Sequence, residues 1–314
     1  MSSSRSGGRP LRKNNQRTYD PAITRPFTHY NSGKKVLTFF QARPDKNQLL
    51  VQREVGWRDA STFSGFCTVH DSVFSPIETA PFASRPEQRF LLAYRAICHE
   101  VYQKSAALKA LPIYSDLIDR GTPQVEQLQY QDMMRTFTAG VSSGLTSART
   151  FKAEMDCELL ARDFGKFSWL TITFSGPLSV VSTGAVTPNL DFEGREIQPL
   201  HDLNKDVQPL FVGTAVTDDG GAIVLGWRPE HDAPKKFIAS LQDRGVDRLP
   251  GSIVQFMFAY IENTYFSEDW WNGLNDLERD AFTTHAVNSN PYYVPPSYKG
   301  SSPVPWKITS VLME

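Results

Sequence analysis

The spacing of apolar residues predicts a long helix in the first third of the chain. From about residue 86 to residue 109, apolar side chains recur every three or four positions, at Phe90, Tyr94, Ile97 and Val101. This spacing places them on one face of an α-helix. Pro86 suits the first helical position, and Pro112 is expected to interrupt the helix.

A second long helix is predicted from about Pro123 to Arg162, where a helical pattern continues until Gly165. Gly140 and Gly144 lie inside this segment and lower its helix propensity. We expect these two glycines to mark a bend or a close crossing of two helices.

Alternating apolar and polar positions predict strands on both sides of the long helices. Residues 36–44 and 48–54 contain two β runs around a turn, and four further runs follow between 166 and 229. Asp219 and Gly220 join the last two runs as a hairpin turn. Three helical segments complete the pattern, at 234–244, 250–266 and 267–286.

This order of elements predicts an α+β protein, because strands and helices occur in separate blocks. We expect an N-terminal β part with a Cys/His corner, two long helices, a four-stranded and mainly antiparallel β section, and C-terminal helices. The expected regions are a disordered basic N-terminal segment at 1–20, a β and helical region at 21–162, a sheet with C-terminal helices at 163–290, and an irregular tail at 291–314.

The composition of the 314-residue chain is that of a globular protein, with 40% hydrophobic and 21% charged residues. No run of about 18 apolar residues occurs, so we expect no membrane span. The three widely spaced cysteines, Cys67, Cys98 and Cys157, argue against a disulfide framework and favour a cytoplasmic protein.

Positive charge is concentrated at the N-terminus, although the whole chain carries only −1. Residues 1–35 contain eight basic residues and one acidic residue, Asp20, so this segment carries +7. Such a basic segment can contact nucleic-acid phosphates. The candidate contacts are Arg5, Arg9, Arg12, Lys13 and Arg17. A solvated tail without this partner is the alternative interpretation.

Cys67 and His70 have the Cys-x₂-His spacing of half a tetrahedral zinc site. Because a structural zinc ion needs four ligands, the others must come from elsewhere, and His29 and His99 are candidates. In the alternative interpretation, Cys67 is a small buried residue and His70 forms a hydrogen bond to a carbonyl group. The sequence leaves the cofactor unknown, and zinc is the candidate that a Cys-x₂-His pair suggests.

His70 and Asp71 also form the adjacent His-Asp pair found in one class of divalent-metal phosphohydrolases. These two residues are the candidate catalytic groups, and His29 would be a further ligand. Pro76 disfavours the long helix that such enzymes require at this place. The last ligand would come from one of two downstream carboxylates, Asp116 or Asp119.

Three segments resemble an uncharacterised bacterial protein family, namely residues 60–78, 87–104 and 261–274. The first is the most specific, because it contains G-F-C-x-x-H-D followed by F-x-P-I-E. Related sequences often carry additional Cys and His residues upstream, which would complete a zinc-finger-like unit. This chain has His29 there but no cysteine before Cys67. The resemblance implies a shared fold and a bacterial or phage-related cytoplasmic setting, without a particular reaction.

Three functions therefore remain open. The first is a regulatory or phage-defence accessory protein that contacts nucleic acid or a protein partner and is not an enzyme. The second is a metal-dependent hydrolase, in particular a nuclease, centred on His70 and Asp71. The third is an oligomeric partner-binding protein whose interface is the aromatic C-terminal region around Trp270 and Trp271.

The basic segment leads to a first prediction. If residues 1–35 bind nucleic acid, the full chain will retard DNA or RNA in a gel at low salt, and a chain without these residues will not. Retardation should weaken as the salt concentration rises, because each phosphate contact releases counterions. The absence of retardation by both forms at low salt would contradict this interpretation.

Overall fold

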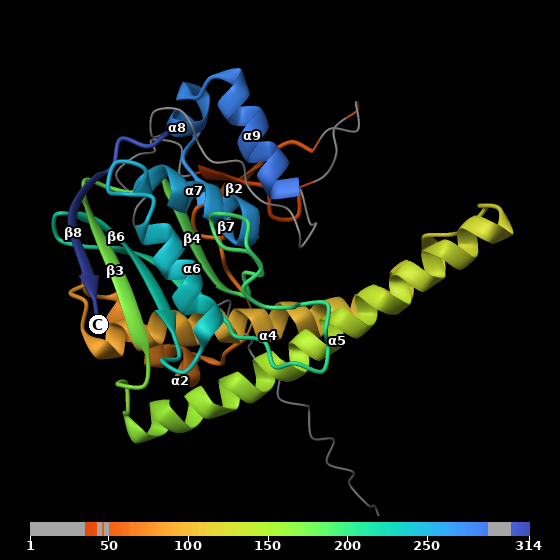
Figure 1. Ribbon diagram of the computed structural model, residues 1–314, viewed down its shortest axis with the longest axis horizontal. Helices are drawn as coiled ribbons and strands as arrows, with labels where there is room; N and C mark the ends of the chain where they lie inside the picture. The colour runs from red at the N-terminus through yellow and green to blue at the C-terminus, as the bar shows by residue number, and fades with distance from the viewer. Residues whose placement is uncertain (1–34, 43–45, 47–49, 64, 288–302) are drawn as a thin grey trace, which may run out of the picture.

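The strands that the structure describes form one antiparallel sheet, and helices cover both of its faces (Figure 1). The computed structural model describes residues 35–42, 46, 50–63, 65–287 and 303–314. The basic N-terminal segment predicted at 1–20 lies outside these residues. Within the described ranges, no helix is both long and apolar enough to cross a membrane.

Eight strands form the sheet in the order β2-β1-β7-β4-β5-β6-β3-β8, and each neighbouring pair is antiparallel. The expected α+β class is confirmed, but the expected four-stranded section is only part of a larger sheet. The strand bounds are β1 Lys35–Thr38, β2 Arg53–Gly56, β3 Ser168–Ser175, β4 Val180–Val186, β5 Leu210–Val216, β6 Gly220–Trp227, β7 Thr264–Phe266 and β8 Lys307–Met313.

Strand β7 joins the N-terminal strands to the rest of the sheet. Phe266 pairs with Leu37 of β1 and with Val180 of β4. The hydroxyl groups of Ser182 and Thr264 lie 2.6 Å apart and connect β4 with β7. The apolar pattern predicted one helix through this region, because a strand of three residues is too short to show the alternation that identifies a strand.

Strand β8 lies within the tail that was expected to be irregular. It pairs with β3, and the hydroxyl groups of Thr173 and Thr309 lie 2.9 Å apart across the pair. The backbone N–H groups of Trp169 and Glu314 each donate to the other residue's carbonyl oxygen, at 2.8 and 2.9 Å. This strand is defined by its pairing with β3, which the local sequence pattern does not report.

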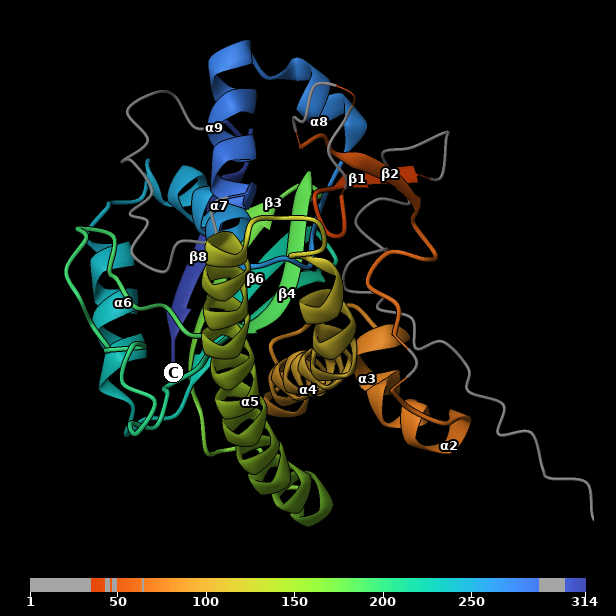
Figure 2. The same cartoon turned by 90° about the vertical axis from the view of Figure 1, so that its right-hand side faces the viewer.

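Helices form a layer on each side of the sheet (Figure 2). Phe211 of β5 packs in the cluster with α4, whereas the next residue, Val212, packs in the cluster with α6 and α7. The helix bounds are α2 Thr68–Asp71, α3 Ser75–Glu78, α4 Pro86–Leu117, α5 Gln124–Ala161, α6 Asp232–Gln242, α7 Leu249–Tyr260, α8 Glu268–Gly273 and α9 Asp276–Val287. The two long helices and the C-terminal helices predicted from the sequence are confirmed.

The predicted interruption at Pro112 is wrong, because α4 continues through it to Leu117. Proline removes one hydrogen bond to the carbonyl group four residues earlier. Pro112 is exposed, so water can satisfy that carbonyl group. Helix α4 therefore extends well beyond the sheet.

A buried ion pair connects the C-terminal part of α5 to the sheet. Arg228, which follows β6, lies 2.7 Å from Glu158, and their side chains are 6% and 8% exposed. The guanidinium group also lies 4.3 Å from the ring centre of Phe167. Glu154 approaches the same guanidinium group at 3.5 Å, but its side chain is 56% exposed.

This arrangement predicts different costs for removing the two carboxylates. Glu158→Ala should lower the free energy of unfolding by about 3 kcal/mol, because a buried guanidinium group loses its close counter-charge. The control Glu154→Ala should lower it by at most about 1 kcal/mol, because that carboxylate is in water. Urea denaturation measures both values, and equal losses would contradict the assignment.

Candidate functional site

The segment with the Cys/His pattern is a corner that covers α4. It forms two one-turn helices, α2 and α3. Glu78 at the end of α3 forms an ion pair with Arg95 of α4, whose guanidinium group lies 4.2 Å from the ring centre of Phe74. Because Arg95 is buried, the F-x-P-I-E half of the pattern supplies both a counter-charge and an aromatic surface for a buried cation.

Gln88 of α4 forms hydrogen bonds with the end of the corner and with the chain that follows it. Its side-chain amide donates to the carbonyl oxygens of Pro76 and Pro81, each at 3.0 Å. Its side-chain oxygen accepts from the backbone N–H of Ala83 at 2.9 Å. These three hydrogen bonds give the corner a structural role as a cover for the helix.

The structure brings Cys67 and His70 together at the surface. Cys67 Sγ lies 3.2 Å from His70 Nδ1, and both residues are exposed. Asp71 Oδ1 is buried and has no hydrogen-bond partner, and His29 lies outside the described residues. Among the residues that the structure describes, no group of three or more His, Cys, Asp or Glu side chains is arranged to hold a metal ion. Zinc binding and catalysis by His70 and Asp71 remain predictions.

His99, the other candidate ligand, is a buried residue of α4. Its Nε2 lies 3.2 Å from Gln103 Nε2, and its ring centre is 5.1 Å from that of Phe63. Burial lowers the pKa of His99 to about 4. The imidazole ring therefore serves as a neutral packing group against the start of the corner.

The carboxylates considered as a last hydrolase ligand lie far from the corner. The corner contacts α4 at Arg95, whereas Asp116 lies in the last turn of the same helix and Asp119 follows it. At 1.5 Å per residue, Arg95 and Asp116 are separated by roughly 30 Å. Asp116 pairs with Arg120 at 2.6 Å. Neither Asp116 nor Asp119 can complete a site at His70.

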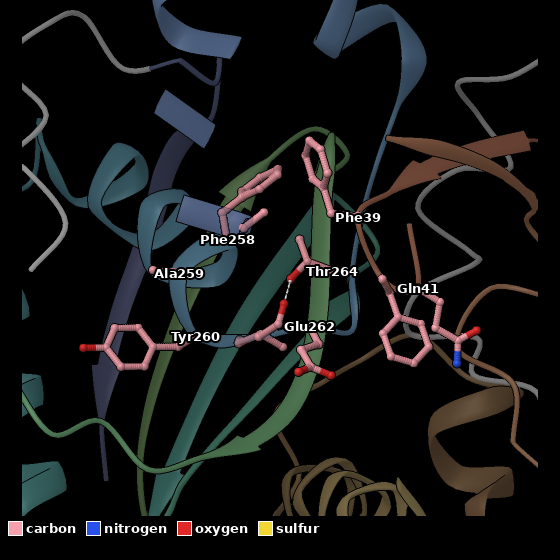
Figure 3. A pocket seen from close by; sticks show the side chains of 10 residues that line it. Phe39, Gln41, Phe258, Ala259, Tyr260, Glu262 and Thr264 are labelled. Carbon is pink, nitrogen blue, oxygen red and sulfur yellow. Dashed lines mark hydrogen bonds between the residues drawn. The ribbon is translucent and has the colours of Figure 1, made fainter. Parts of the chain in front are cut away.

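A cavity of about 480 Å³ lies between the end of β1 and the turn from α7 to β7 (Figure 3). Its wall includes Phe39, Gln41, Phe258 and Glu262. The surrounding protein raises the pKa of Glu262, although its side chain reaches solvent, and the nearby Glu100 adds to the rise. Glu262 is the only titratable acid or base among the described residues of this wall except a tyrosine, so the cavity presents no pair of groups for acid–base catalysis.

Helices α4 and α5 form an antiparallel hairpin that extends beyond the sheet (Figure 1). Near its base, a cavity of about 210 Å³ separates the hairpin from the chain between β4 and β5. Lys104 and Gly140 line this cavity from the two helices. Lys104 also crosses α5 closely, because a Cβ atom at Gly144 would lie 3.2 Å from its Cε atom. We call residues 105–139, beyond this cavity, the arm.

The two helices of the arm meet along a coiled-coil seam, in which positions alternate three and four residues apart. Ser115 and Gln131 face each other there, with Ser115 Oγ donating to Gln131 Oε1 at 2.9 Å and Gln131 Nε2 donating to the Ser115 carbonyl oxygen at 2.8 Å. Leu111 and Met134 of the seam are buried. The remaining seam positions are Leu108, Ile118, Gln127 and Thr138.

One side of the arm is apolar and exposed. In an antiparallel coiled coil, the heptad positions that flank the seam on one side of each helix lie next to each other. Four of the side chains on this side are between 50% and 62% exposed, namely Tyr114, Leu117, Met133 and Phe137. Tyr130 lies between them on α5 and is half-buried. We call these five residues the arm face.

The charged residues of the arm lie on its other side or near its turn, where three exposed apolar side chains also occur, namely Ile113, Val125 and Leu128. Two ion pairs form within the arm, Asp116 with Arg120 at 2.6 Å and Asp132 with Arg135 at 3.1 Å. The arm contains three basic and four acidic residues, so its net charge is −1. This distribution does not suit a phosphate backbone, whereas an exposed apolar surface of this kind is typical of protein interaction sites.

Comparisons with protein-family models, with curated proteins and with solved structures each found no match for this chain. No related fold or family therefore assigns a role to the corner, the cavities or the arm. Their roles follow from the geometry and chemistry of the described residues.

The buried histidines predict how stability depends on pH. Burial lowers the pKa of His99 and of His285 to about 4, from the ordinary value of 6.5. The unfolded chain binds these protons at higher pH, so stability present above pH 6.5 is lost as the pH falls towards 4. Each histidine contributes up to about 3 kcal/mol to this loss.

The free energy of unfolding, measured by urea denaturation between pH 7 and pH 4, should therefore decline less in His99→Gln than in the unchanged chain. The reason is that this variant keeps only one of the two buried histidines whose protonation opposes folding. His201→Gln is the control, because His201 is exposed. A decline as steep in His99→Gln as in the control would show that His99 does not contribute.

Proposed function

We propose that this chain is a partner-binding protein that docks through the arm. The observation that supports this proposal is the arm face, a set of large apolar side chains exposed on one side of a helical hairpin that extends from the sheet. Monomeric proteins rarely expose contiguous apolar surface of this kind without a use for it. The α+β body would hold the base of the hairpin rigidly and present its end.

The aromatic C-terminal region does not offer the interface that the sequence suggested. Trp271 is buried in the large hydrophobic cluster, and Trp270 Nε1 donates to the carbonyl oxygen of Pro303 at 2.6 Å. Ser267 caps α8 by accepting from the backbone N–H of Trp270. These aromatic residues anchor the C-terminal helices, so the partner-binding role moves to the arm.

The other functions predicted from the sequence receive less support. Nucleic-acid contact would depend on residues 1–34, which lie outside the described residues, and the arm is not basic. A hydrolase would depend on His70 and Asp71, for which the described residues provide only Cys67 as a neighbouring candidate ligand. A cytoplasmic regulatory or defence role is compatible with partner binding and rests on the sequence alone.

Site-specific photo-crosslinking in the producing cell tests this proposal. A photoreactive residue at Leu117 or Phe137, on the arm face, should give a discrete crosslinked species whose peptides can be identified by mass spectrometry. The matched controls are Leu128 on the other side of the arm and Arg149 on the body part of α5, both exposed. Equal crosslinking from all four positions, or none from the arm face, would contradict docking through it.

A further inference from the structure

We propose that the occupant of the arm face is a second copy of this chain, and that two arms associate into a four-helix bundle. This inference rests on the proposed function, because it names the partner that the arm receives. It concerns a contact between arms and leaves the body of each copy separate.

The arm face is suited to contact its own copy. Across the seam, Ser115 lies opposite Gln131, so Tyr114 and Met133 lie near the middle of the face along the hairpin. Leu117 lies towards the turn and Phe137 towards the body. A two-fold axis across the middle of the face, at right angles to the helices, would lay α5 of one copy antiparallel on α5 of the other and α4 on α4. Phe137 of each copy would then lie near Tyr130 of the other, as an isologous interface requires. Leu117 of each copy would lie near Ala110 of the other.

The charge distribution also favours a second copy. A surface with net charge of one sign repels an identical surface, but the arm face consists of three aromatic and two aliphatic residues with no ionisable group at neutral pH. The acidic and basic residues of the arm lie mainly on the opposite side, where they remain in water in such a dimer. Association would therefore desolvate apolar side chains without burying an unpaired charge.

The exposed area of the arm face and its borders approaches the size that a self-contact needs. From their exposure, the five side chains of the arm face offer on the order of 500 Å² to a partner. The small residues beside them, Ala107 and Ala110, allow the helices of a second hairpin to approach closely. A stable interface buries about 800 Å² on each side, so the arm face and its borders approach that size.

The length of the arm fits the same geometry. The part of α5 from Gln124 to Ala139 spans about 24 Å. This length gives four turns of helix, enough for two heptads of side chains to interdigitate with a second hairpin. In the bundle, side chains of the two copies would interdigitate as those of α4 and α5 already do at the seam within each copy.

Sedimentation velocity of the purified full chain tests this inference over a wide range of protein concentration. The mass should rise from the 35.3 kDa of one chain towards twice that value as the concentration increases. Phe137→Asp and Leu117→Asp should keep the chain monomeric, because each places a charge in the apolar contact.

The matched control is Leu128→Asp, which makes the same change at an exposed leucine on the other side of the arm. This variant should dimerise like the unchanged chain. Circular dichroism and thermal unfolding should be nearly the same for all variants, because the three side chains are at least half exposed and contribute little to the core of one copy. If an Asp variant has lost its helices, Phe137→Ser replaces it, and this variant should also dimerise more weakly than the unchanged chain.

An unchanged chain that stays at 35.3 kDa at every concentration would overturn the inference. Equal loss of dimer in Leu128→Asp and Phe137→Asp would also overturn it. If the chain is monomeric but Phe137 crosslinks to a different polypeptide in cells, self-association fails and docking through the arm stands. If it is monomeric and the arm face gives no crosslink, both proposals fail.

Discussion

The burial of α4 is the constraint on which the rest of this structure depends. Twelve consecutive residues of this helix, from Gln88 to His99, are buried, whereas an ordinary surface helix buries one stripe. A helix buried on every side needs cover from every direction. The sheet covers one side, α5 a second, and the α2–α3 corner a third. The corner has its place in the fold for this geometric reason, whatever else its exposed Cys67 and His70 do.

Polar residues within the buried part of α4 connect distant segments of the chain. Arg95 forms an ion pair with Glu78 of the corner. Gln88 donates to a backbone carbonyl within α3, at Pro76, and to one beyond it, at Pro81. Arg89 pairs with Glu314 at the end of the chain and lies 5.8 Å from the ring centre of Trp169. Because an unpaired buried polar group is costly, each partner must be in place when the helix is buried. The burial of one helix thereby couples the N-terminal corner to the last strand.

The same helix has no cover from the sheet beyond Lys104. There α4 and α5 bury only their shared seam, and apolar residues that flank the seam remain in water. Packing between α4 and α5 cannot account for Phe137 or Leu117, because neither side chain belongs to the seam. The transition from a fully covered helix to a half-covered hairpin separates a structural part from an interaction part. The function proposed for the protein follows from this separation.

Local periodicity alone determined much of the secondary structure. The three-to-four spacing predicted the two long helices, the Asp219-Gly220 pair predicted the β5–β6 hairpin, and the helical pattern at 267–286 predicted the region of α8 and α9. In each case the signal lies within a few residues of the element that it specifies. The corner was also recognisable as a distinct unit, although its residue types suggested a metal site and its packing makes it a cover for Arg95.

Only the tertiary structure decided how these elements combine. Strands β7 and β8 are recognisable through their partners, because three residues, or a short run after an irregular segment, carry too little pattern of their own. The number of strands therefore could not be counted from the sequence. The arm face was missed for a related reason. Apolar residues at helical spacing are the same whether a second helix, a sheet or water lies beside them, and only the positions of distant segments decide which of these it is.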